Sequence, residues 1–381
     1  MTVSRRAWLG GGGAWLAAAA ARPGRAFALA DQLRSGDGSG ATAASSGAVR
    51  ARLSLNENPF GPSPAAIAAL ARHTTELCRY VESEAEAFAA LVAGREHLPT
   101  DQIVLGEILE SLGVMLGLAG GPGGEIVYSV PGYTALVDAA GRVGGVGVAV
   151  PLNQRLENDL PALAARVNAK TRAVFLVNPH NPSGTVSAGT TFKAFVREIS
   201  QRTLVIVDEA YLEFGDDFVQ RTAVDLTRAG ANVAVFRTFS KFYGLGALPL
   251  GYAAVPRTLA QQLKSQGVGD PRSLNALTLA AATASLNDAS FATSTRALVA
   301  AERARWTAAL DALKLRHTDA RGNFVFFETG RPNAEVARAF LAEGVKIGRA
   351  FPPLDRWARI SIGLPEENAL ARAALKKLFA P

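Results

Sequence analysis

Short runs that are apolar at every position recur between residues 100 and 255, separated by stretches long enough for helices. Examples are AVFLV at 173–177, LVIV at 204–207 and VAVF at 233–236. A strand with one face in water alternates apolar and polar residues, whereas a strand covered by helices on both faces does not. The pattern therefore predicts an α/β fold with a mostly parallel sheet sandwiched by helices. The seven strands that we expect are 103–105, 125–130, 145–150, 173–177, 204–207, 233–236 and 251–255.

The residue pattern changes after residue 257, where the short apolar runs give way to longer stretches. Long stretches rich in Ala, Leu and Arg indicate helices, short β-rich runs follow them, and a last helix begins near Glu366. Because 381 residues are long for a single core, we expect a large domain and a smaller α+β domain. The smaller domain would join an N-terminal arm at 50–80 to residues 269–381, and the large domain would span 81–268. Within the C-terminal part the expected helices are 258–268 and 275–314, and the expected strands are 324–328 and 359–362.

The first thirty residues differ from the rest. Arg5 and Arg6 precede an Ala/Gly-rich apolar run, and small residues follow up to Ala30. This order is typical of a twin-arginine signal peptide at 1–30, cleaved after Ala28 or Ala30. The run is shorter than the roughly 20 apolar residues of a membrane span. We therefore expect no stable membrane span, export by the twin-arginine machinery and a periplasmic or secreted protein. The alternative is a frayed N-terminal helix in a cytosolic protein.

Residues 31–49 are rich in Gly, Ser and Ala without periodicity and predict a disordered linker. Without the four arginines of the first thirty residues, the net charge falls from +7 to +3. So mild a charge argues against nucleic-acid binding. The single cysteine, Cys78, excludes an internal disulfide, and the four histidines show no ligand spacing, so we expect no metal site.

Three of the most buried runs end in polar sequences. The run at 173–177 leads into NPHNPSGT, that at 204–207 into DEAY, and that at 233–236 into RTFSK. Ligands of open parallel sheets bind beyond the carboxyl ends of the strands. Taken singly, each polar residue could cap a turn or helix, or be a solvated surface charge. Their occurrence in this order after three buried strands favours a site for a polar, anionic ligand.

With these motifs the chain resembles the fold-type I pyridoxal-phosphate-dependent aminotransferases of class I/II, and within them the histidinol-phosphate aminotransferase-like group. The resemblance extends from Leu53 to the C-terminus. It rests on the three strand-end motifs together with LNENPFGP at 55–62, RY at 79–80, PGY at 131–133, NF at 323–324 and RISIG at 359–363.

The resemblance implies pyridoxal 5'-phosphate as cofactor and gives residues of this chain roles around its ring. Lys241 would form the Schiff base with the cofactor aldehyde and then move the proton at the substrate α-carbon. Asp208 would keep the pyridine nitrogen protonated. Asn181 and Tyr211 would hydrogen-bond the phenolic oxygen of the ring, and Tyr133 would stack on its face.

The resemblance also implies contacts to phosphate and substrate. Thr238 and Ser240 would offer hydroxyls to the cofactor phosphate. Tyr80 matches a tyrosine that reaches the phosphate of the neighbouring subunit, which implies a homodimer with shared active sites. Arg359 would bind the α-carboxylate of the substrate in a bidentate fork. The two further substrate-binding candidates are Arg349, for the far end of the substrate, and Asn323.

Two features depart from the family pattern. Pro249 stands where the family places a phosphate-binding arginine, and proline offers neither a charge nor an N–H. Glu107 and Glu110 bring negative charge to the expected phosphate-binding turn near Gly106. Two explanations stay open. Arg237 or a residue of the other subunit could supply the missing charge, or the protein could hold its cofactor mainly through Lys241 and Asp208.

These expectations combine into an exported enzyme that transfers an amino group between an amino acid and a 2-oxo acid. Export argues against histidinol phosphate as substrate, because biosynthetic phosphate esters stay in the cytosol. Two alternatives remain. One is another pyridoxal-phosphate reaction on the same scaffold, as in a decarboxylase, a lyase or a racemase. The other is a non-catalytic relative that binds an amino acid or the cofactor.

Overall fold

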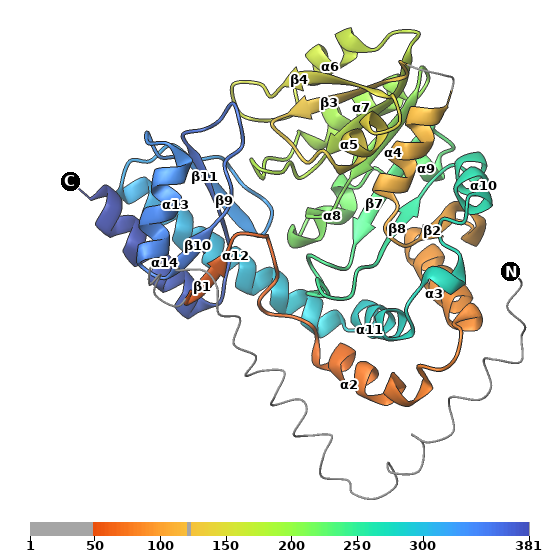
Figure 1. Cartoon of the computed structure of the whole chain (residues 1–381), viewed down its shortest axis with the longest axis horizontal. Coiled ribbons are helices and arrows are strands. Elements are labelled where there is room, and N and C mark those ends of the chain that lie inside the picture. The colour runs from red at the N-terminus through yellow and green to blue at the C-terminus, as the bar shows by residue number, and fades with distance from the viewer. Residues whose placement is uncertain (1–48, 120–122, 381) are drawn as a thin grey trace, which may run out of the picture. The chain divides into compact units, whose positions relative to one another are not determined.

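The computed structural model describes residues 49–119 and 123–380, which belong to one compact unit (Figure 1). The predicted signal peptide at 1–30 and all of the predicted linker except Val49 lie outside the described residues. Among the described residues, no helix is long and apolar enough to cross a membrane.

A seven-stranded sheet forms the centre of the larger part of the fold, with the strand order β2-β8-β7-β6-β5-β3-β4. β8 runs antiparallel to both of its neighbours, and the pairs among β3 to β7 are parallel. The predicted fold class is therefore confirmed, and all seven predicted strands lie in this sheet. Their bounds are β2 Ile103–Leu105, β3 Glu125–Val130, β4 Val146–Pro151, β5 Thr171–Val177, β6 Leu204–Asp208, β7 Val233–Thr238 and β8 Gly251–Ala254.

Both faces of the central strands are buried, and this explains their uninterrupted apolar sequences. Side chains alternate across a strand, so Val174 and Leu176 pack into one core while Ala173 and Phe175 pack into the other. One face is covered by α4 Leu109–Leu118, α5 Ala135–Gly141 and α10 Arg257–Ser265. The other is covered by α3 Glu82–Glu96, α6 Leu160–Arg166, α7 Gly189–Ile199 and α9 Val224–Arg228. The short helix α8 Phe218–Arg221 precedes α9.

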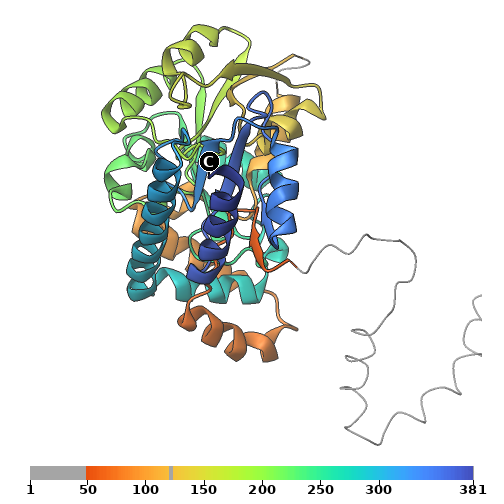
Figure 2. The same ribbon diagram turned by 90° about the vertical axis from the view of Figure 1, so that its left-hand side faces the viewer.

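The smaller part of the fold contains two short sheets formed by segments far apart in the sequence. β9 Phe324–Glu328 pairs antiparallel with β11 Trp357–Ser361, and β1 Ala51–Leu53 pairs parallel with β10 Val345–Ile347. Figure 2 shows the helices that accompany these strands lying beside one another. They are α12 Ala289–Ala312, α13 Asn333–Ala342 and α14 Pro365–Phe379. The N-terminal arm thus lies against the C-terminal region, and the domain boundaries at 80/81 and 268/269 stay predictions.

The expected long helix at 275–314 is two helices, α11 Ala276–Leu286 and α12. The break falls at Asn287 and Asp288, and the Asp288 carboxylate caps α12 by accepting from the backbone N–H of Phe291 at 2.9 Å. Aspartate favours such a cap over a helix interior. α11 packs against α2 Pro64–His73 of the arm.

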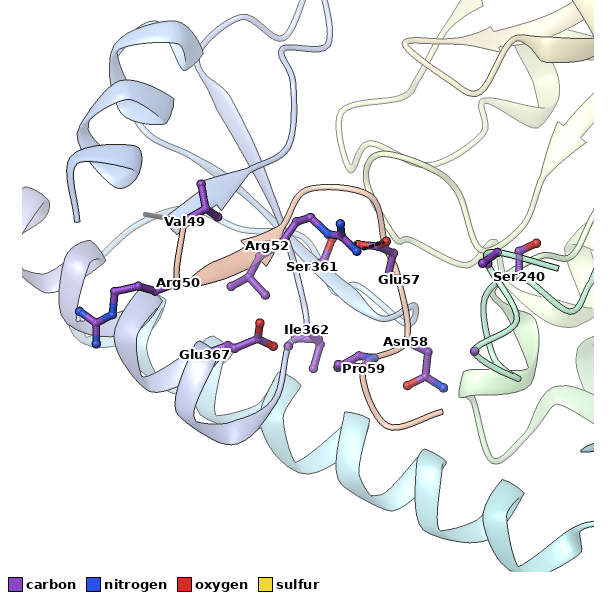
Figure 3. Close-up of a pocket in the computed structure, with 15 residues that line it drawn as sticks. Val49, Arg50, Arg52, Glu57, Asn58, Pro59, Ser240, Ser361, Ile362 and Glu367 are labelled. Carbon is purple, nitrogen blue, oxygen red and sulfur yellow. Dashed lines mark hydrogen bonds and ion pairs between the residues drawn. The ribbon is translucent and has the colours of Figure 1, made fainter. Parts of the chain in front are cut away.

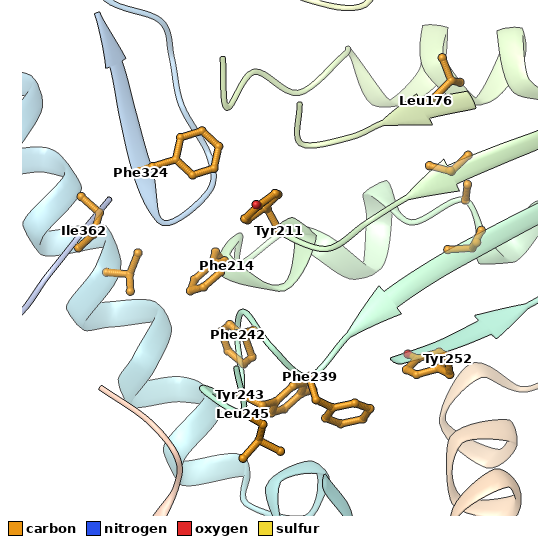
Figure 4. Close-up of a cluster of buried hydrophobic side chains, with 14 of the residues drawn as sticks. Leu176, Tyr211, Phe214, Phe239, Phe242, Tyr243, Leu245, Tyr252, Phe324 and Ile362 are labelled. Carbon is orange, nitrogen blue, oxygen red and sulfur yellow. The ribbon is translucent and has the colours of Figure 1, made fainter. Parts of the chain in front are cut away.

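A cluster of buried aromatic side chains lies beneath the ends of β6 and β7 (Figure 4). In this view the ring of Tyr211 lies between Phe324 and Phe214. The Tyr211 and Phe324 rings meet edge to face at 5.2 Å, and Phe214 meets Phe242 in the same way at 5.2 Å. Phe242 directly follows Lys241, so this packing holds the backbone at the predicted catalytic lysine.

Candidate active site

The three polar strand-end motifs lie side by side, because β5, β6 and β7 are adjacent parallel strands. Val177 is paired with Asp208, and Asp208 with Phe236, across the three strands. The residues that follow these positions therefore meet at one edge of the sheet. The side chains of Asn181, Asp208, Tyr211 and Lys241 come from this edge.

Asp208 ends β6 with its carboxyl group buried. Within the described residues, the hydrogen bond that its side chain accepts comes from the backbone N–H of Ala210 at 3.0 Å. Burial raises the pKa of Asp208 to about 6, and the negative charge of Glu209 acts in the same direction. The Ala210 hydrogen bond and the charge of Lys241 act against it. A buried carboxylate without a bonded cation is suited to accept a hydrogen bond from a cationic ring nitrogen.

Lys241 lies in the turn after β7, and its Nζ donates to the backbone carbonyl of Leu55 in the arm at 3.1 Å. Burial lowers the pKa of Lys241, and the nearby guanidinium of Arg359 lowers it further. The carboxylates around it, including Asp208, act in the opposite direction. A lysine with a lowered pKa has more of the neutral, nucleophilic amine at neutral pH.

Arg359, on β11, contacts both the strand-end loop and the arm. Its Nη1 donates to Oδ1 of Asn181 at 2.6 Å, and its Nη2 donates to the carbonyl of Ser54 at 2.8 Å. Its Nε is buried and has no hydrogen-bond partner in the described part of the chain. Burial lowers the pKa of Arg359 to about 10, so it is still a cation at neutral pH.

Tyr211 receives hydrogen bonds from two amides. Nδ2 of Asn181 donates to its hydroxyl at 3.4 Å, and Nδ2 of Asn56 donates to it at 3.1 Å. Asn56 belongs to the arm motif LNENPFGP, to which the sequence analysis gave no role beyond the resemblance. The same is true of Ser361, whose hydroxyl hydrogen-bonds Asn56 and which lies in the RISIG motif. The two motifs indicated that Asn56 and Ser361 belong to family-typical segments. The sequence did not show which residues they hydrogen-bond.

Tyr133 follows β3, and its side chain is 43% exposed. Burial of the rest of the ring raises the pKa of Tyr133 to about 12, and the charges of Asp208, Glu107 and Glu110 raise it as well. Tyr133 is therefore near Asp208 and near the expected phosphate-binding turn. Its stacking on a ring stays a prediction.

The predicted phosphate-binding hydroxyls lie at the end of β7. Oγ1 of Thr238 accepts from the backbone N–H of Ser240 at 3.1 Å and donates to the carbonyl of Leu250 at 3.4 Å. Ser240 lines a cavity of about 620 Å³ together with Glu57 and Asn58 of the arm. Figure 3 shows the arm running between Ser361 on one side and Ser240 on the other.

The remaining predicted residues lie apart from this cluster or have other partners. Tyr80 is 80% exposed on the segment before α3. Arg349 is exposed and lies over the ring of Phe351 at 4.6 Å. Asn323 is buried, and its Nδ2 donates to the carbonyls of Asn56 and Glu57 at 3.0 Å each. Asn323 therefore holds the arm, and a contact of any of these three residues with a ligand stays a prediction.

One explanation offered for the missing phosphate charge was wrong. Arg237 was a candidate for that charge, but its guanidinium is buried between two carboxylates. Nη1 donates to Glu96 at 2.9 Å, and Nη2 donates to Glu209 at 3.1 Å. An arginine neutralised by two buried acids is not available to a phosphate.

The ring end of pyridoxal 5'-phosphate fits this arrangement. Asp208 offers the buried acceptor, Asn181 and Tyr211 offer groups for the phenolic oxygen, and Lys241 offers the amine. The phosphate end has hydroxyls from Thr238 and Ser240. Within the described residues, no group of three or more His, Cys, Asp or Glu side chains is arranged to hold a metal ion.

Comparison with known proteins decides the family. Residues 51–375 match the family model described as aminotransferase class I and II. The chain belongs to the class I and II aminotransferases. This match confirms the prediction that the protein is a fold-type I transferase that depends on pyridoxal phosphate.

Relatives of this aminotransferase align with most of the chain. It is 34% identical over 327 residues to the histidinol-phosphate aminotransferase of Limosilactobacillus fermentum, covering 85% of this chain and 89% of the relative. It is 36% identical over 321 residues to the aromatic amino acid aminotransferase of Thermobifida fusca, covering 84% and 87%. The crystal structure of histidinol-phosphate aminotransferase from Sinorhizobium meliloti in complex with pyridoxal-5'-phosphate has a TM-score of 0.78 at 27% identity, covering 87% and 91%.

Proposed function

We propose that this aminotransferase is an exported enzyme that transfers an amino group between an amino acid and a 2-oxo acid, with Lys241 as the catalytic amine. One observation carries the proposal. Asp208 ends β6, Lys241 follows the adjacent parallel strand β7, and Lys241 and Arg359 donate to the carbonyls of the neighbouring arm residues Leu55 and Ser54. An amine and a buried acid at one edge of the large sheet, with an arginine of β11 beside them, can bind the three polar parts of a cofactor-bound amino acid.

Pyridoxal 5'-phosphate, when bound, supplies an aldehyde that takes up the amino group and a ring that accepts electrons from the α-carbon. Asp208 would accept a hydrogen bond from the ring nitrogen and keep that nitrogen protonated. Lys241, with its lowered pKa, would take a proton from the α-carbon of the substrate and deliver it to the aldehyde carbon of the cofactor. The hydroxyl groups of Thr238 and Ser240 would donate hydrogen bonds to the phosphate.

Arg359 supports transfer over the other reactions of this cofactor. Its cationic guanidinium, held in place by Asn181 and the carbonyl of Ser54, suits a carboxylate beside the ring. With its α-carboxylate held by Arg359, the substrate would present its α-C–H bond for cleavage. Decarboxylation would need the bond to the carboxylate to be presented instead, so a tightly held carboxylate would oppose it.

The relatives are named for histidinol phosphate and for aromatic amino acids. For this chain we propose a free amino acid as donor, because the twin-arginine pattern at Arg5 and Arg6 supports export away from cytosolic phosphate esters. We further propose a homodimer in which the exposed Tyr80 reaches the phosphate in the partner's site.

The visible spectrum of the purified protein tests the reaction. We expect absorbance from bound pyridoxal phosphate, borohydride fixation on Lys241, and a stoichiometric spectral change when an amino acid is added without an oxo acid. Lys241→Ala should abolish fixation and lower activity by at least about 10²-fold, whereas Lys264→Ala on α10 should change neither. Catalytic release of carbon dioxide or ammonia, or racemisation without net transfer, would instead show another reaction of the same cofactor.

Two further experiments test export and the shared site. Replacing Arg5 and Arg6 together by lysine should retain the protein in the cytoplasm, and unchanged export would contradict the twin-arginine route. Mixing inactive Tyr80→Ala and Lys241→Ala proteins under subunit exchange should restore activity if Tyr80 acts in the partner's site. Failure to restore it would place Tyr80 in its own subunit or outside the site.

A further inference from the structure

Asn56 has every polar group of its backbone and side chain engaged. It is 1% exposed, and its φ of 55° lies in the left-handed region. Its backbone N–H donates to Oγ of Ser361 at 2.8 Å, and its carbonyl accepts from Asn323 at 3.0 Å. Its side chain is hydrogen-bonded as well, through Oδ1 to Ser361 and through Nδ2 to Tyr211. These fixed partners define one orientation for the Asn56 amide.

Ser361 decides which way the amide of Asn56 points. The Ser361 hydroxyl accepts from the backbone N–H of Asn56 and donates its own proton to Oδ1 of the same residue at 3.0 Å. Because Oδ1 takes that proton, the opposite end of the amide, Nδ2, faces Tyr211 and donates to its hydroxyl at 3.1 Å.

The second amide at Tyr211 is oriented in a similar way. Arg359 donates to Oδ1 of Asn181 at 2.6 Å, so Nδ2 of Asn181 faces the Tyr211 hydroxyl at 3.4 Å. The hydroxyl oxygen of Tyr211 thus accepts hydrogen bonds from the amides of both Asn56 and Asn181. The proton of Tyr211 has no acceptor in either amide and must point elsewhere.

We propose that Asn56 is a positioning residue of the active site, which holds the Tyr211 hydroxyl as a donor toward the phenolic oxygen of the cofactor ring. This inference rests on the proposed function. An N–H group that donates to a phenol makes its O–H a stronger donor, because successive hydrogen bonds polarise one another. Asn56 then acts on the cofactor through Tyr211, although the two residues are 155 positions apart.

The pH dependence of the cofactor absorbance in substrate-free protein measures this effect. A weaker donor at Tyr211 leaves the phenolic oxygen of the ring more basic, so the spectral midpoint moves to higher pH. Asn56→Gly removes the amide and keeps the left-handed backbone, which glycine adopts readily. We expect an upward shift of about half to one pH unit, smaller than that of Tyr211→Phe.

A matched control lies two residues away on the same arm. Asn58 is also buried, and its Nδ2 donates to the carbonyl of Phe242 at 2.6 Å without touching Tyr211. Asn58→Gly removes a buried amide of the same arm and should leave the midpoint unchanged, because the hydrogen bond from Asn56 to Tyr211 stays in place. In a Tyr211→Phe background, Asn56→Gly should add nothing.

A midpoint shift that Asn58→Gly reproduces, or that persists without the Tyr211 hydroxyl, would overturn the inference. So would an unchanged midpoint in Asn56→Gly. Wild-type protein that binds no cofactor would overturn the proposed function itself, and this outcome is visible before any variant is made.

Discussion

Nη1 of Arg359 donates to Oδ1 of Asn181 at 2.6 Å, so the residue predicted to bind the substrate carboxylate touches a residue predicted to contact the cofactor ring. The chain of contacts continues through Tyr211 and Asn56 to Ser361, which lies two residues from Arg359 on the same strand. Residues two apart on a strand point to the same face. If Arg359 binds a carboxylate as proposed, that binding would be coupled through these contacts to Asn181, Tyr211 and Asn56.

Arg359→Lys should lower kcat/KM by about ten- to a hundred-fold. A lysine ammonium cannot bridge Asn181 and Ser54 while also presenting a planar donor to a carboxylate. Steady-state kinetics with the amino donor measure the effect. Arg356→Lys is the control, because Arg356 is exposed and donates to the backbone of Gly330. Equal losses in both variants would contradict the role of Arg359.

Asp208→Asn should change how stability depends on pH in cofactor-free protein. Burial raises the pKa of Asp208 to about 6 from 3.8, so between these values the folded protein binds more protons than the unfolded chain. Wild-type stability therefore falls as pH rises through this window, and asparagine does not titrate. The stability of the variant relative to wild type should grow by up to about 3 kcal/mol between about pH 4 and about pH 7. Urea unfolding measures it, and a constant difference would refute the assignment.

Pro249→Arg should strengthen binding of pyridoxal phosphate by about ten- to a hundred-fold. Pro249 lines a cavity of about 530 Å³ with Gly106, Glu107 and Ser111, and no lysine or arginine among the described residues lines it. A new cation there would contact the phosphate. Pyridoxal, which lacks the phosphate, serves as the control ligand and should bind both proteins equally. No gain for the phosphate form would point to a cation from the partner subunit.

Arg237→Met should lower the free energy of unfolding by about 3–5 kcal/mol, because it leaves the carboxylates of Glu96 and Glu209 buried without their cation. The exposed pair of Arg142 and Glu110 is the comparison, and Arg142→Met should cost less than about 1 kcal/mol. Denaturant unfolding distinguishes them. Similar costs would mean that the buried network contributes little.

Local pattern was enough to predict the large sheet. A run such as LVIV is apolar at every position because helices cover both faces of its strand, and this burial is visible without the partners of the strand. Asn181, Asp208 and Lys241 could be placed together for a related reason, since parallel strands bring their carboxyl ends to one edge. By contrast, β1 (ARL) and β10 (VKI) each carry a charged residue in the middle of three, so neither forms an apolar run like that of the equally short β2 (IVL).

The partners of the site residues were decided by the tertiary structure. Arg237 meets Glu96 across 141 residues, Asn56 meets Tyr211 across 155, and Arg359 meets the carbonyl of Ser54 across 305. These pairs depend on how the arm and the C-terminal strands fold back on the large sheet. Periodicity reports how far each side chain is buried but not which distant group it meets. The residue types of the active site are therefore readable from the chain, whereas their hydrogen-bond partners follow from long-range packing.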